Sequence, residues 1–211
     1  MLEFLIKDFL ILWTTIDPIG TLALFASLTA RKSRSERRRI ALKSTLYAFA
    51  VLLGSIVLGQ IILTGMGIRL ISLQVAGGII LFLFGLQMIF GGSFSGESER
   101  PEKSHDMAVF PIAIPAIATP GAIMAAIVLT DNNVYSIAQQ AMTTGVLAAV
   151  LLITYLMMLL SERILSIIGQ NGALILVKVM GMLLAALSVE LFMEAIGAER
   201  WLQWGDPALT G

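Results

Sequence analysis

The stretch TTIDPIG, residues 14–20, places an aspartate and a proline inside an apolar run that extends from Leu2 to Ala30. Proline has no N–H group and suits the first position of a helix, and it pushes the residue before it out of the helical region. Asp17 is therefore expected to cap a new helix that begins at Pro18, because its side chain accepts hydrogen bonds from the first free backbone N–H groups. The stretch predicts a membrane-spanning helix that is broken in its middle.

The composition places the chain in a bilayer. Of its 211 residues, 57% are hydrophobic and 13% are charged, the mean hydropathy is +0.90, and a soluble domain has about 25% charged residues. The formal net charge of zero gives no reason to expect a nucleic-acid partner, and the absence of cysteine excludes disulfides and cysteine metal sites. The single histidine, His105, lies in a polar stretch typical of a loop, so we expect no metal and no cofactor.

Six apolar runs are long enough to cross the hydrocarbon, which takes about 20 residues per helix. The runs are continuous and show none of the alternation typical of membrane strands. We therefore expect an all-α integral membrane protein with six transmembrane helices. The expected helices cover residues 2–30, 40–64, 70–91, 107–130, 135–160 and 172–196.

The orientation follows from the basic run RKSRSERRR, residues 31–39, which the positive-inside rule places in the cytoplasm. The N-terminus is then outside, and the loops at 96–106 and 161–171 are inside. Ten of the 14 Lys and Arg residues lie in or beside these cytoplasmic loops. We expect a multi-pass protein of the cell (inner) membrane, in which the basic run anchors the topology, although it also suits anionic lipid head groups.

A second break is expected in the fourth run, where TPG occupies residues 119–121. Thr119 can cap a helix that begins at Pro120 in the same way that Asp17 does before Pro18. The two prolines differ by 102 in residue number. Matching positions in the third and sixth runs differ by 103: Gly78 with Gly181, Gly85 with Ser188, and Gln87 with Glu190.

These offsets predict two related halves, 1–94 and 107–211, joined by a cytoplasmic linker at 95–106. Each half has three helices, and because three is odd the second half enters the membrane from the opposite face. Such an inverted repeat is common in secondary transporters. Gly78 and Gly85 lie two turns apart on one face of the expected third helix. Small residues at this spacing favour close helix packing over ligand binding.

A helix break in a membrane must be buried in protein or reached by a watery cavity, and the start of each half-helix offers N–H donors and a partial positive charge. A plain proline kink is the alternative at either break. We expect a small zwitterion whose ammonium faces Asp17 and whose carboxylate takes the N–H groups of Gly121, Ala122 and Ile123. The expected substrate-binding residues are Thr15, Asp17, Pro18, Gly20, Thr119, Pro120, Gly121 and Ala122.

Two acids are expected to carry a coupling ion, H⁺ or Na⁺. Asp17 is one, at the first break. Glu190 is the other, because ionisable residues inside a membrane usually mark function, although a structural pairing of Glu190 is equally consistent with its position.

Four stretches resemble the MarC family. They are DPIGTLALFASLT at 17–29, the basic run at 31–39, QVAGGIILFLFGLQMIF at 74–90 and MAVFPIAIPAIATPGAI at 107–123. The resemblance covers nearly the whole chain and the same six-span plan. It implies a SnatA-like transporter of small neutral amino acids such as glycine and alanine, coupled to an ion gradient.

The chain departs from the family pattern at two places beside the expected site. Ala23 stands where the family has a second proline, and Thr119 stands where the family has a glycine before Pro120. These two changes therefore bear on which amino acid the protein prefers.

Other classes remain open. A channel, or an exporter of other small solutes, is the main alternative, although most polar residues cluster at breaks and loops instead of forming a continuous stripe. An enzyme is not expected, because the chain has neither an intramembrane histidine nor a phosphate-binding Gly-x-x-x-x-Gly-Lys stretch. Membrane lipid is an expected partner, and a homo-oligomer formed through glycine-rich faces is compatible with the pattern.

Overall fold

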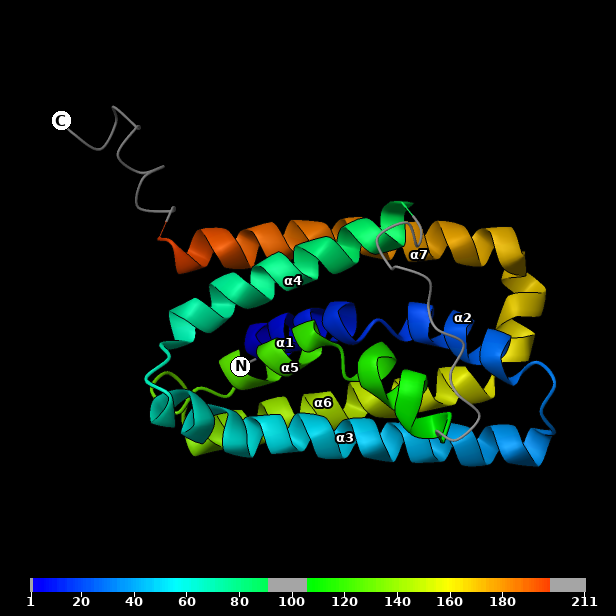
Figure 1. Cartoon of the computed structure of the whole chain (residues 1–211), viewed down its shortest axis with the longest axis horizontal. Coiled ribbons are helices and arrows are strands. Elements are labelled where there is room, and N and C mark those ends of the chain that lie inside the picture. Colours follow the sequence, from blue (N-terminus) through cyan, green and yellow to red (C-terminus); the bar gives the residue numbers. More distant parts are fainter. Residues whose placement is uncertain (1, 91–105, 198–211) are drawn as a thin grey trace.

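A computed structural model describes residues 2–90 and 106–197, and every regular element in these ranges is a helix (Figure 1). The absence of strands from the described ranges agrees with the all-helical prediction. The elements are α1 (Leu2–Ile16), α2 (Pro18–Thr29), α3 (Arg34–Gly65), α4 (Leu70–Phe90), the π-helical segment η1 (Ala108–Ile117), α5 (Pro120–Val128), α6 (Ile137–Leu159) and α7 (Ser161–Ala195).

Four described segments are long and apolar enough to cross a membrane, and a fifth is formed if the bent pair η1 and α5 counts as one span. The four are Leu2–Thr29, Arg34–Gly65, Ile71–Phe90 and Ile137–Leu159. The expected six crossings are therefore not confirmed. The expected sixth span lies in α7, which carries Lys178, Glu190 and Glu194 and is interrupted at Gly169, where φ is 72° and ψ is 166°.

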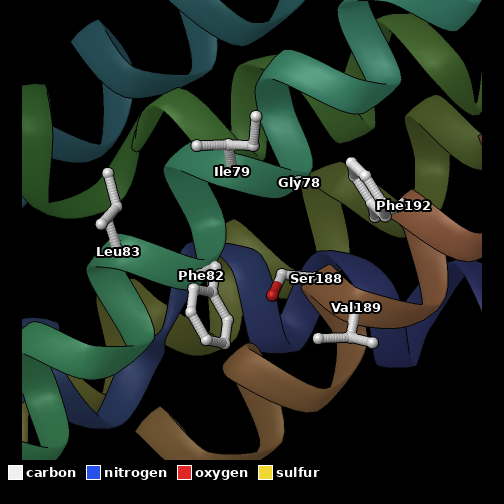
Figure 2. A pocket seen from close by; sticks show the side chains of 7 residues that line it. All are labelled: Gly78, Ile79, Phe82, Leu83, Ser188, Val189 and Phe192. Carbon is white, nitrogen blue, oxygen red and sulfur yellow. The ribbon is translucent and has the colours of Figure 1, made fainter.

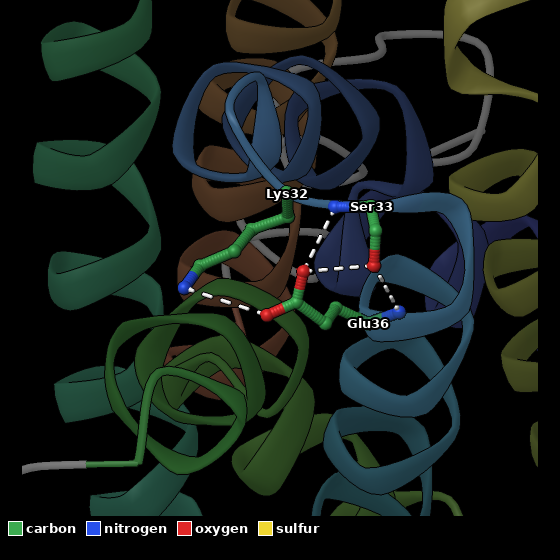
Figure 3. A network of polar contacts seen from close by, with 3 residues as sticks. All are labelled: Lys32, Ser33 and Glu36. Atoms are coloured by element: carbon green, nitrogen blue, oxygen red, sulfur yellow. Dashed lines mark hydrogen bonds and ion pairs between the residues drawn. The ribbon is translucent and has the colours of Figure 1, made fainter.

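The helix α3 begins earlier than predicted, at Arg34 instead of residue 40. Ser33 caps it in a capping box: the Ser33 N–H donates to the Glu36 carboxylate at 2.9 Å, and the Glu36 N–H donates to the Ser33 hydroxyl at 3.3 Å (Figure 3). Lys32 lies 3.9 Å from the same carboxylate. Most of the basic run is thus helical, because a complete cap outweighs the polar composition that suggested a loop.

The expected loop at 161–171 is also wrong, because α7 already begins at Ser161. Its first residue, Ser161, is buried, and the next two, Glu162 and Arg163, are polar and exposed but are good helix formers. Composition alone does not separate a polar loop from a polar helix end. Residues 95–105 of the expected linker lie outside the described residues.

The helices form three layers, visible in Figure 1. On one side α4 packs along α7, which is the most extensive helix pair, and on the other side α3 packs against α6. The segments α1, α2, η1 and α5 lie between these two pairs. Of these, α1, α2 and α5 contact both pairs, whereas η1 packs against α3 and α2. The main buried cluster joins this middle layer to α3 and α6, and it includes Leu12, Ile16, Phe25, Leu52, Ile117, Leu147 and Met158.

Small residues line the seam between α4 and α7, which confirms that the face carrying Gly78 and Gly85 packs closely against another helix. A Cβ atom added to Gly85 would lie 2.8 Å from the carbonyl oxygen of Gly181, and one added to Gly78 would lie 3.1 Å from the carbonyl oxygen of Ser188. The two backbones therefore approach too closely for larger side chains at these positions. Because the contacts ascend one helix while descending the other, the pair is antiparallel.

Candidate functional site

The first break is a single-residue interruption at Asp17, whose backbone is left-handed with φ of 49° and ψ of 71°. The Asp17 carboxylate accepts a hydrogen bond of 3.0 Å from the Gly20 N–H and so caps α2, as predicted. Helical bonds continue on both sides, from the Asp17 N–H to Trp13 and from the Thr21 N–H to Asp17, each 3.0 Å long. The break therefore interrupts the helix at a single residue without ending the span.

The second break is sharper, with a bend of 55° between η1 and α5. Thr119 caps α5, and Pro120 occupies its first turn, as predicted. Before the break, Phe110 and Ile114 leave the helical region, which agrees with the irregularity that the two prolines of η1 favour.

The donors at this second break are mostly in use. The Ala122 N–H donates to the Thr119 hydroxyl at 2.9 Å, and the Ile123 N–H donates to the Thr119 carbonyl at 3.0 Å. The expected cradle of three free N–H groups is therefore wrong for this conformation, because the capping threonine satisfies two of them.

The two breaks are joined by two hydrogen bonds across the middle layer. The Thr119 hydroxyl donates to the carbonyl oxygen of Thr15 at 2.8 Å, and the Thr21 hydroxyl donates to the carbonyl oxygen of Ala116 at 3.1 Å. Each break thus supplies one hydroxyl to a carbonyl that the other break has exposed. The three threonines are at most 2% exposed, so this junction lies inside the protein.

Seven of the eight expected substrate-binding residues are buried or half-buried at this junction: Thr15, Asp17, Pro18, Gly20, Thr119, Gly121 and Ala122. Pro120 is exposed. A Cβ atom on Gly121 would collide with Leu81, so α4 packs directly onto the second break. Glu190 is exposed on α7, so the structure does not bring it to the buried carboxylate of Asp17.

Alanines make the junction compact. Ala118 and Ala122 are at most 1% exposed, and Ala23 is half-buried. A cavity of about 210 Å³ lies elsewhere, on the outer surface between α4 and α7, where Phe82, Ser188 and Phe192 are among its lining residues (Figure 2). The cavity walls are apolar.

Sequence reasoning missed Asp8, a buried acid of α1 that is 1% exposed. The Thr143 hydroxyl of α6 lies 2.5 Å from its carboxylate. The sequence signal was present, because Asp8, like Asp17, is an acid within an apolar run, and such acids usually mark function.

A buried arginine was missed as well. Arg37 of α3 is 9% exposed, donates a 2.8 Å hydrogen bond to the Ser161 hydroxyl and forms an ion pair with Glu162. Its guanidinium also lies 5.7 Å from the centre of the Phe25 ring. No sequence signal distinguishes Arg37 from the other basic residues of the run.

The apolar spans, the interior breaks and the capped half-helices define a multi-pass integral membrane protein. The chain belongs to the MarC family, because residues 2–199 match the model of the MarC family integral membrane proteins.

Several proteins are similar along nearly their whole length. A UPF0056 membrane protein from Archaeoglobus fulgidus is 34% identical over 92% of this chain and 93% of its own. A UPF0056 membrane protein from Methanocaldococcus jannaschii is 32% identical over 92% of this chain and 97% of its own. The UPF0056 inner membrane protein YhgN from Escherichia coli K12 is 30% identical over 89% of this chain and 92% of its own. No solved structure matches.

Proposed function

We propose that the protein is a secondary transporter of small neutral amino acids that binds its substrate where the two helix breaks meet. The carrying observation is the pair of buried hydrogen bonds, Thr119 to Thr15 and Thr21 to Ala116, that join the breaks. Irregular backbone inside a membrane is tolerated where it is enclosed by protein or lines a cavity. Binding sites of transporters commonly lie at such broken helices near the midplane.

An inverted repeat is part of this proposal, and the capping motifs support it. The capping box of α3 uses Ser33 and Glu36, and that of α6 uses Ser136 and Gln139. Each residue of the second box follows its counterpart by 103 positions, the offset found between the third and sixth runs.

The glycine seam adds independent support. Gly78 contacts Ser188. The residue 103 positions after Gly78 is Gly181, the residue 103 positions before Ser188 is Gly85, and these two glycines are also in contact. A twofold relation between the halves requires each contact between them to have a second, equivalent contact, and this pair of contacts meets that requirement. The three layers are consistent with this, since each combines an element of one half with its counterpart in the other.

The substrate would use the chemistry of both breaks. Its ammonium faces Asp17, whose carboxylate oxygens have lone pairs beyond the one that accepts from Gly20. Its carboxylate takes the positive end of α5, displacing the Thr119 hydroxyl from the Ala122 N–H. Since the junction is closed in this structure, substrate entry requires the two connecting hydrogen bonds to open as one half rocks against the other.

The orientation is proposed from the charges at one end of the helix layers. Arg37 binds the start of α7, and Lys43 forms a 2.9 Å ion pair with Asp106. We assign this basic end to the cytoplasm and the N-terminus to the outside, in the inner membrane.

Uptake by the purified protein in liposomes tests the proposal. Labelled glycine or alanine should accumulate with saturable kinetics when a proton or sodium gradient is imposed. Asp17→Asn should abolish most of this uptake, whereas Glu3→Gln, which neutralises an exposed acid of α1, should not. Uptake that rises linearly with concentration would identify a channel instead. Absence of amino acid uptake by the unmodified protein, together with passage of other solutes, would refute the assigned substrate.

A further inference from the structure

Asp8 is an acid buried within the first membrane span. It is 1% exposed and precedes Asp17 by nine residues, which places it about 13 Å along the helix from the break. Among the described residues no basic side chain forms an ion pair with it. A buried carboxylate without a cation partner is costly to keep charged and tends to bind a proton instead.

The Thr143 hydroxyl is arranged to serve Asp8 in either protonation state. Its oxygen lies 2.5 Å from Asp8 Oδ2 and 3.1 Å from the carbonyl oxygen of Gln139. A hydroxyl has one proton to donate and can also accept. With Asp8 ionised, Thr143 donates to the carboxylate. With Asp8 protonated, the acid donates to Thr143, which donates to Gln139. Both states are satisfied by rotating one hydroxyl.

The charged groups around Asp8 come from several elements. Lys7 neighbours it on α1 but is exposed. Of the helices packed against α1, α5 has no ionisable residue and α6 has only Tyr155. The chain before α6 adds Tyr135, which is within electrostatic range of Asp8.

Tyr135 itself is surrounded by acidic groups. The Tyr135 ring packs against the Phe4 ring at an interplanar angle of 53°, with ring centres 5.7 Å apart. Burial raises the pKa of Tyr135, and the negative charges of Asp8, Glu194 and Asp131 add to that rise. Tyr135 therefore lies within electrostatic range of Asp8, and the neighbouring cation of α1, Lys7, is exposed.

We propose that Asp8 is a proton-binding site that takes up and releases one proton in each transport cycle, with Thr143 as its hydrogen-bond partner in both states. The proton enters from one side of the membrane and leaves to the other, so no other reactant is needed. The role in transport rests on the proposed function, but proton binding at Asp8 does not.

Infrared titration of the purified full-length protein tests the proton site itself. The carboxylic-acid carbonyl band should contain a component that titrates with pH and is lost in Asp8→Asn. Thr143→Val should shift its midpoint by about one pH unit, the size expected for losing a hydrogen bond to a charged group, and Thr143→Ser should restore it. Thr144→Val is the matched control, because Thr144 is the next residue of α6 and its hydroxyl donates to the carbonyl of Gln140, not to Asp8. A band unaltered in Asp8→Asn, or equal shifts in the two valine variants, would overturn the proposal.

Transport assays separate this inference from the proposed function. In liposomes, Asp8→Asn should retain exchange of labelled for unlabelled amino acid. Its uptake driven by a proton gradient should be at least tenfold lower than that of the unmodified protein. If gradient-driven uptake survives in Asp8→Asn, the proton role is wrong while the transporter assignment stands. If the unmodified protein moves no amino acid, the assignment fails, and the infrared result still decides whether Asp8 binds a proton.

Discussion

The Thr119 hydroxyl donates a 2.8 Å hydrogen bond to the carbonyl oxygen of Thr15 while it accepts one of 2.9 Å from the Ala122 N–H. One side chain thus caps the second half-helix and ties it to the first. Because the contact spans 104 positions of sequence, it couples the geometry of the two breaks directly.

Thr119→Val removes both bonds while keeping the size and branching of the side chain. We expect a loss of stability of about 2–4 kcal/mol, from the missing cap and a buried carbonyl left without its donor. Thermal unfolding in detergent measures the loss. Thr119→Ser keeps the hydroxyl and should stay within about 1 kcal/mol of the unmodified protein. Equal destabilisation by both variants would mean that the hydroxyl does not hold the junction.

Gly85→Ala should destabilise the seam between α4 and α7, because the new methyl group would meet the carbonyl oxygen of Gly181 at 2.8 Å. Overpacking of this kind costs about 1–3 kcal/mol. The control is Gly54→Ala in α3, where nothing lies within 4 Å of the added atom. It should gain up to about 1 kcal/mol from helix propensity. Melting temperatures that fall in Gly54→Ala but not in Gly85→Ala would contradict the seam.

Substitutions at Arg37 and at Arg38 can be compared to measure how much the contact between α3 and α7 contributes to stability. Arg37 is buried on Ser161, whereas Arg38 is exposed. Each methionine substitution removes one positive charge, so only the contact differs. We expect Arg37→Met to cost about 1.5–3 kcal/mol, the range for a hydrogen bond to a charged group, and Arg38→Met to cost less than about 0.5 kcal/mol. Chemical unfolding compares them, and similar losses would show that the buried contact contributes nothing.

Asp106 should make a small part of the stability depend on pH. Its hydrogen bond from Lys43, and then one from the Ala108 N–H, lower the pKa of the carboxyl group below its ordinary value. A lowered pKa in the folded state gives stability that is present above the unfolded pKa of about 3.9 and is lost as pH falls through the folded pKa.

Asp106→Asn tests this linkage, since it keeps an acceptor for Ala108 and removes the charge. The unmodified protein should be more stable by about 0.2–1 kcal/mol at neutral pH, as is usual for exposed pairs, and the difference should vanish in strong acid. Melting temperatures of the two proteins across pH give the result. A difference that does not change with pH would exclude the ion pair as its source.

Local patterns predicted the breaks well. Asp17 before Pro18 and Thr119 before Pro120 place a capping side chain next to a residue that cannot continue a helix, and both caps form as expected. The glycine seam was also predictable, because small residues two turns apart indicate close packing in lipid.

Helix ends and partners were less predictable. Polar turns at the starts of α3 and α7 resemble loops in composition, and a helix end beyond the apolar zone has no hydrophobic signal to mark it. The burial of Asp8 and Arg37, and the exposure of Glu190, depend on which helix lies opposite each side chain.

The sequence by itself therefore determined that this is a helical membrane protein with two capped interruptions, because hydropathy, proline and capping act within a few residues. Only the tertiary structure decided that the interruptions meet through Thr119 and Thr15, and that Asp8 is enclosed against Thr143. Those contacts join residues more than 100 positions apart, and their formation depends on the packing of whole helices against one another.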